Sequence, residues 1–132
     1  MELLEWTSRF IDYRNSFKRN LLKKEFSEKE IFCEYNNNTK RIYLVSEFLD
    51  DDIFKKINSE KITIVCLNSK KNVAFLIEKW DKFTKNKNLK IIFVNPKLNQ
   101  QWSIVPYTHD LISDKTTLKL GIKSMFESVP AV

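Results

Sequence analysis

A short apolar segment, an amphipathic segment and a second apolar segment follow one another between residues 61 and 94. The two apolar segments, Lys61–Asn68 and Leu89–Val94, are rich in β-branched residues and too short to span a membrane, which is typical of strands buried on both faces. The segment between them has apolar residues at helical spacing: Val73, Leu76, Ile77, Trp80 and Phe83. A strand, a helix and a strand with short connections form a crossover, so we expect two parallel strands.

Polar residues set the limits of this helix. Asn68 or Ser69 can cap its first turn. The run Asn86–Asn88 should end it, because Asn has low helix propensity and tolerates left-handed backbone. Four lysines then fall on its wetter sides, and they form a candidate basic face: Lys70, Lys71, Lys79 and Lys82.

The residues before this unit predict a helix, a hairpin and a short helix. Apolar and aromatic residues step by three and four from Glu2 to about Lys24, which predicts one long amphipathic helix. Residues 30–35 and 41–46 flank an asparagine-rich turn, as in a β-hairpin. A short helix within Phe48–Asn58 begins with acidic residues and continues with lysines, the order that a helix dipole favours.

The residues after the second strand predict one more strand and a final helix. Asn95 and Pro96 end the second strand, and residues 101–105 predict a strand that Pro106 breaks or confines to an edge. The final helix is capped by Ser113 or Asp114. Gly121 lies in the middle of this helix, where it costs about 1 kcal/mol relative to Ala. We therefore expect close packing of this glycine against a strand.

These elements predict one three-layer α/β domain over residues 1–132, with α+β as the alternative class. Its order is an N-terminal helix, a β-hairpin and then a β-α-β-β-α mixed sheet, and 132 residues are enough for a single core. The two cysteines, Cys33 and Cys66, fit a reducing compartment. Because the N-terminus lacks the pattern of a secretory signal, we expect a cytoplasmic protein without a membrane association.

This order of elements resembles the core of the restriction-endonuclease-like nucleases, and a small Rossmann-like parallel sheet is the alternative. The resemblance implies a carboxylate that ends one strand and an acid-x-Lys pair on the next, which together hold a divalent metal. Glu47 can stand at the first position, but residues 65–68 contain no such pair. The resemblance therefore implies a catalytically inactive member. The order and the direction of strand 41–46 in the sheet distinguish the two folds, and the sequence leaves both open.

Several classes of site are excluded by residue type. A chain with one glycine has no glycine-rich phosphate loop or dinucleotide fingerprint. One histidine and two distant cysteines do not make an ordinary zinc site. The consecutive acids Asp50 to Asp52 at a helix start point in different directions, so they are not expected to hold a hard cation. Cys66 lacks an arginine six residues downstream, where Asn72 stands, so a phosphate loop around this thiol is not expected. We predict no catalytic residue, no metal and no cofactor, and hence no enzyme.

The charge of the chain is concentrated in one region. Residues 55–90 hold ten lysines and three acidic residues, a net charge of +7, while the whole chain carries +6. Lysine outnumbers arginine by 19 to 4, although arginine is the better bidentate ligand for phosphate. The basic region is therefore either a solvated face or a weak polyanion-binding surface.

Ligands of open α/β sheets gather at the carboxyl ends of strands, which places a candidate site near Asn68 and Asn95. The least regular segment of the chain begins there and is dense in aromatic and hydrogen-bonding groups. We interpret five of its residues as a candidate recognition site, with a purely structural role as the alternative: Asn95, Trp102, Tyr107, His109 and Asp110.

The predicted function is that of a non-catalytic interaction module. Its partner is an unknown protein, or a second copy of the chain that docks through the N-terminal helix. The alternative is a weak nucleic-acid-binding protein with an inactive nuclease-like fold.

Overall fold

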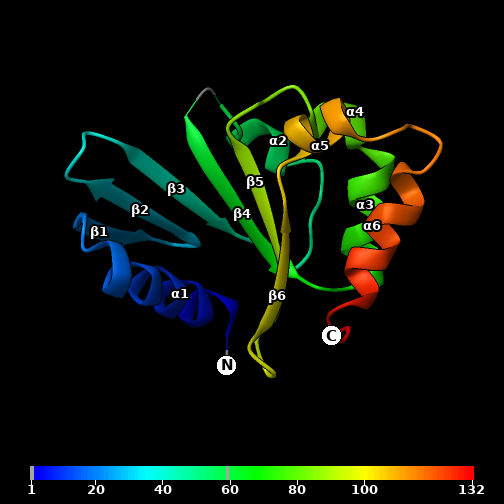
Figure 1. Cartoon of the computed structure of the whole chain (residues 1–132). Helices are drawn as coiled ribbons and strands as arrows, with labels where there is room; N and C mark the ends of the chain where they lie inside the picture. Colours follow the sequence, from blue (N-terminus) through cyan, green and yellow to red (C-terminus); the bar gives the residue numbers. More distant parts are fainter. Residues whose placement is uncertain (1, 59) are drawn as a thin grey trace.

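In the computed structural model of the chain, which describes residues 2–58 and 60–132, a six-stranded mixed sheet lies between two layers of helices (Figure 1). Helix α1 covers one face of the sheet, and α2 to α6 lie on the other side. This arrangement confirms a mixed α/β class. The elements are α1 Leu3–Lys18, β1 Leu21–Ser27, β2 Glu30–Tyr35, β3 Lys40–Val45, α2 Ile53–Lys56, β4 Lys61–Leu67, α3 Lys70–Glu78, α4 Trp80–Phe83, β5 Leu89–Asn95, β6 Gln100–Ile104, α5 Pro106–Ile112 and α6 Leu118–Glu127.

The strands lie side by side in the order in which they occur in the chain, β1 to β6. β1, β2 and β3 form an antiparallel meander, β3, β4 and β5 are parallel, and β6 returns antiparallel to β5. The parallel β4–β5 pair and the hairpin of β2 and β3 confirm the sequence predictions. β3, whose direction the sequence left open, is antiparallel to β2 and parallel to β4. The sheet thus has a parallel centre, β3 to β5, with antiparallel pairings on both sides.

The predicted N-terminal helix is too long, because α1 ends at Lys18 and β1 follows. Arg19 adopts a left-handed conformation with φ of 50°, and its amide donates to the carbonyl of Asn15. The Asn15 side chain then accepts the amide of Leu21 at 3.0 Å, which fixes the turn into the strand. Leu22, which falls within the predicted helix, lies in β1 and is 68% exposed. β1 is an edge strand without a fully buried residue, so apolar alternation does not mark it.

The helix after β4 is divided into α3 and α4 at Lys79, whose backbone leaves the helical range. Ser69 caps α3, because its hydroxyl oxygen accepts the amide of Asn72 at 3.2 Å. The short helix before β4 covers only Ile53–Lys56.

Three predictions about the last third of the chain are wrong. Residues 106–112, expected to be irregular, form α5, and Pro106 starts this helix because a first turn needs no amide donor. The final helix begins at Leu118, after a turn in which the Asp114 carboxylate accepts the amide of Thr116 at 3.0 Å. A Cβ atom added at Gly121 would have no neighbour within 4 Å, so the expected close packing is absent there.

Strand alternation divides the buried residues into two apolar layers, one on each face of the sheet. The layer beneath α1 includes Val65, Leu67, Ile92 and Val94, while Ile62, Ile64, Ile91 and Phe93 face the other helices. Each buried aliphatic side chain contributes about 1.5–3 kcal/mol relative to an exposed one. In the described part of the chain, no helix has the length and apolar character needed to cross a bilayer.

Candidate anion-binding site

Polar residues occupy the amino halves of the three parallel strands on the face that α1 covers. On this face the carboxyl halves carry apolar side chains that pack beneath α1. The amino halves instead carry cationic side chains, and strand register places them next to one another. These residues are Arg41 in β3, Lys61 in β4 and Lys90 in β5. The amino ends of parallel strands meet at one edge of the sheet, so the three charges are brought together.

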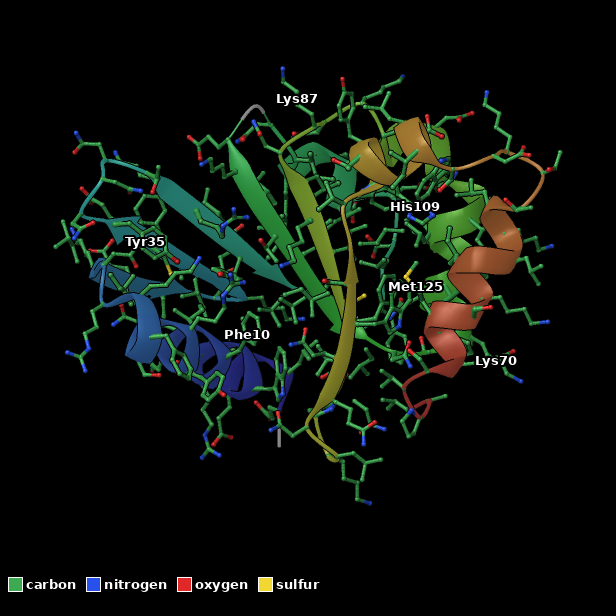
Figure 2. All side chains as sticks on the ribbon, in the orientation of Figure 1. Phe10, Tyr35, Lys70, Lys87, His109 and Met125 are labelled. Carbon is green, nitrogen blue, oxygen red and sulfur yellow. The ribbon has the colours of Figure 1, made fainter. Side chains whose placement is uncertain are left out.

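A hollow of about 250 Å³ lies between the C-terminal half of α1 and these amino halves. We call it the basic hollow. Tyr35, labelled in Figure 2, lies on its β2 side. Lys40 also borders it, but by strand alternation its side chain faces away from α1. Five cationic side chains converge on the hollow: Arg14 and Lys18 from α1, with Arg41, Lys61 and Lys90 from the sheet.

The charges of the basic hollow are not compensated. No Asp or Glu lines it, and within residues 2–58 and 60–132 none of the five cations forms an ion pair. The pKa of Lys90 is lowered by burial and then by the charges of Arg14, Arg41 and Lys18. The cations are therefore close enough to repel one another, and a bound anion would relieve that repulsion.

Hydroxyl groups complete the lining. The buried hydroxyl of Thr63 accepts a 2.7 Å hydrogen bond from a guanidinium nitrogen of Arg41, which holds this guanidinium against the sheet. Burial raises the pKa of Tyr35 and of Tyr43, so both phenols remain protonated at neutral pH. The lining contains no carboxylate, histidine or cysteine. The hollow is therefore suited to binding an anion.

Two residues of the predicted recognition site are buried in structural roles. Asn95, at the end of β5, donates to the carbonyl of Pro130 at 3.0 Å and accepts the amide of Leu98 at 3.2 Å. Trp102 stacks on Phe93 with 4.2 Å between ring centroids. These contacts tie the end of β5 to the C-terminal residues and β6 to the core.

The other three residues of that prediction lie on α5, which follows β6 at the opposite edge of the sheet from Asn95. The Asp110 carboxylate accepts the indole N–H of Trp80 at 2.9 Å, and the ring of His109 meets Trp80 edge-on at 5.8 Å. Tyr107 is exposed. The structure therefore brings His109 and Asp110 together around Trp80 but does not join the five residues into one site.

The predicted basic face is also divided. Lys70 and Lys71 start α3 at the carboxyl edge of the sheet, and Lys70 lies far from the opposite edge in Figure 2. Lys79 lies 3.5 Å from Asp51. We call the edge of the sheet where the parallel strands begin the amino edge. Of these four lysines, Lys82 alone, in α4, borders a hollow near the amino edge. The predicted basic face therefore includes one lysine near the amino edge and no residue of the basic hollow.

A signal for the basic hollow is present in the sequence. Lys61 and Thr63 alternate at the start of an otherwise apolar strand, and Lys90 stands in the same place in the next strand. Arg14 and Lys18 are one helical turn apart. These three signals are far apart in the sequence, and only the register of the sheet and the position of α1 bring them together.

Two further results concern the class of site. Within the residues that the structure describes, no group of three or more His, Cys, Asp or Glu is placed to hold a metal ion. Comparison with protein-family models, with curated proteins and with solved structures gave no match to this chain. The basic hollow therefore carries the functional interpretation.

Proposed function

We propose that this chain is a non-catalytic binding domain that receives the phosphate groups of a ligand in the basic hollow. The observation that carries this proposal is the convergence of five cations from α1, β3, β4 and β5 on one hollow without a lining carboxylate. Arg14 and Arg41 supply planar forks that suit phosphate oxygens, and the lysines supply further positive charge. The protonated phenols and amide groups around them provide neutral donors.

Phosphate fits the charge of the basic hollow better than a single carboxylate does. A phosphate monoester carries about 1.5–2 negative charges at neutral pH, because its second pKa is about 6. A linear polyphosphate carries more. Five unpaired cations within one hollow need several negative charges for neutralisation, so the proposal favours a ligand with more than one phosphate.

The proposal is tested by titration calorimetry and thermal unfolding with inorganic tripolyphosphate. Binding at about ten times Kd should stabilise the fold by about 1.4 kcal/mol, which raises Tm by about 4–8 °C. The double variant Lys61→Gln with Lys90→Gln should weaken binding by about tenfold or more. The matched control, Lys70→Gln with Lys115→Gln, loses the same net charge away from the hollow and should bind as the unaltered chain does.

The absence of saturable tripolyphosphate binding would contradict the proposal. Equal loss of affinity in both double variants would also contradict it, because the effect would then arise from net charge rather than from the basic hollow.

We also propose the restriction-endonuclease-like arrangement over the Rossmann-like one. Support comes from the strand order, which follows the chain without the reversal that a doubly wound sheet shows. The β4 residues Val65 to Leu67 offer no acid-x-Lys pair, which supports a non-catalytic member. Weak cleavage of DNA that needs a divalent metal and is lost in Glu47→Gln would contradict this assignment of an inactive domain.

A second candidate function is association with a protein through α1. Tyr13 and Phe17 are 66% and 72% exposed, and their rings pack edge-on at 5.2 Å. An exposed aromatic pair on a helix is a common feature of interfaces. Light scattering tests the homodimer directly. Association that grows with concentration and is lost in Phe17→Ser would support it, and a monomer at every concentration would contradict self-association.

A further inference from the structure

The basic hollow continues into two neighbouring hollows. The first of these, of about 220 Å³, lies over the amino edge of the sheet and shares Arg41, Lys61 and Lys90 with the basic hollow. We call it the edge hollow. The second, of about 600 Å³, lies beside α2 and α4 and shares Lys87 and Asn88 with the edge hollow. We call this one the helix hollow. The three form one path from the α1 face, over the amino edge, to the face covered by the other helices.

This path is positively charged along its whole length. The edge hollow adds Lys87, and the helix hollow adds Lys82 and Lys85, all three of them exposed. Among the residues that the structure describes, no Asp or Glu lines any of the three hollows. Glu60 and Asp81 are sequence neighbours of the path but do not border it. Lys87, labelled at the amino edge in Figure 2, marks the point where the path passes from one face to the other.

We infer that this path binds the backbone of single-stranded nucleic acid, with successive phosphates in the basic, edge and helix hollows. The inference rests on the proposed function, because the basic hollow is the first of its phosphate sites. Three features favour a single strand over other polyanions, and they are the bend of the path, its length and the groups between its charges.

The bend excludes stiff or flat partners. A DNA duplex has a persistence length of about 50 nm, so it does not turn around the edge of one sheet. An anionic membrane surface is flat at this scale, and it cannot contact charges that lie on both faces and the edge. A single strand is flexible and follows a bent basic groove.

Length and chemistry favour a strand over a small phosphorylated ligand. A ligand confined to the basic hollow leaves the three lysines of the helix hollow without a partner. Between the charges, the helix hollow carries amide side chains and the partly buried ring of Phe54. Amide side chains hydrogen-bond the edges of bases. The Phe54 ring stacks on Phe75, and the Lys82 ammonium lies 5.2 Å from its centroid, so this ring holds a cation at the hollow, beside the amides. Recognition should depend little on base sequence.

The test measures fluorescence anisotropy with a labelled oligonucleotide of about 15 nucleotides, as single-stranded DNA, single-stranded RNA and duplex DNA. We expect single strands of one or both kinds to bind, with duplex at least about tenfold weaker. The triple variant Lys82→Gln, Lys85→Gln and Lys87→Gln should weaken single-strand binding by about tenfold or more. It should also reduce the slope of log K against log salt by about 2, because three phosphate contacts on a single strand are lost.

The control for charge is Lys70→Gln, Lys115→Gln and Lys119→Gln, which should leave both the affinity and the slope nearly unchanged. The control for the first phosphate site is tripolyphosphate, which the helix-hollow variant should bind as tightly as the unaltered chain. Tripolyphosphate binding without single-strand binding would overturn this inference and leave the proposed function standing. Equal affinity for duplex DNA, or for polyglutamate, would also overturn the inference. Failure to bind either probe would overturn both proposals.

Discussion

The guanidinium of Arg41 donates a 2.7 Å hydrogen bond to the hydroxyl of Thr63 on the neighbouring parallel strand. Thr63 is almost completely buried, whereas Arg41 is half-buried at the mouth of the basic hollow. The hydrogen bond to Thr63 therefore holds the Arg41 guanidinium against the sheet, while its other N–H groups stay available to a ligand. A positioned guanidinium loses less freedom on binding than a free one does.

Thr63→Val tests this positioning. The substitution keeps the shape of the side chain and removes the acceptor, so we expect tripolyphosphate affinity to fall by about threefold to tenfold, or about 1 kcal/mol. Stability should change little, because the freed guanidinium donor can reach water. Calorimetric titration provides the measurement, with Thr108→Val on an exposed turn of α5 as the matched control. Unchanged affinity would mean that Thr63 does not orient Arg41 for binding.

Lys90→Met should stabilise the ligand-free protein. The pKa of Lys90 is lowered in the folded state by burial and by nearby cations, so folding disfavours its charged form. This cost is fully present at neutral pH and disappears as pH rises toward the ordinary lysine pKa of about 10.4. We expect the variant to unfold at higher urea concentration at pH 7, with a smaller gain near pH 10. A less stable variant at pH 7 would contradict the charge repulsion.

Asn68 stabilises the carboxyl edge of the sheet. Its side-chain oxygen accepts the indole N–H of Trp102 at 2.8 Å, and its amide nitrogen donates to the carbonyl of Val129 at 2.9 Å. Asn68→Leu leaves both partners unsatisfied, which should cost about 2–4 kcal/mol and lower Tm by about 7–14 °C. Thermal unfolding checks this, with exposed Asn36→Leu as the control. A loss of less than about 0.5 kcal/mol, as for a surface substitution, would be inconsistent with this role.

Gly121→Ala should stabilise the fold by about 0.5–1 kcal/mol. Gly121 lies within α6, has an ordinary helical backbone, and a Cβ atom there meets no neighbour within 4 Å. Alanine then gains helix propensity and restricts the unfolded chain. Urea unfolding measures the change. Destabilisation would indicate a closer neighbour of α6 than the structure shows.

The central parallel strands could be predicted from sequence because their signal is local. β4 and β5 are short β-branched runs on either side of an amphipathic helix, and only a parallel crossover connects them in this way. The edge strand β1 could not be predicted, since its residues are mostly exposed and Leu22 continues the helical stripe of α1. α5 was missed because Pro106 reads as a strand breaker as well as a helix start.

The basic hollow could not be predicted because its residues come from distant parts of the chain. Arg14, Arg41, Lys61 and Lys90 share a surface only after β3, β4 and β5 pair in the observed register. A count of charge along the chain pointed to residues 55–90, which include Lys61 and Lys90. The candidate basic face was instead placed on the helical lysines from Lys70 to Lys82, which lie at two opposite edges of the sheet. Residue type also misled the choice of a recognition site, since buried Asn95 and Trp102 use their polar groups within the core.

The most direct test of the account is a backbone amide NMR titration with inorganic tripolyphosphate. We predict saturable shifts confined to the basic hollow and its border, including Arg41, Lys61 and Lys90, with no change at Lys70 or Asn95. Shifts that centre on Lys70, or that spread evenly over all exposed lysines without saturation, would contradict the assignment of a phosphate site to the amino halves of the parallel strands.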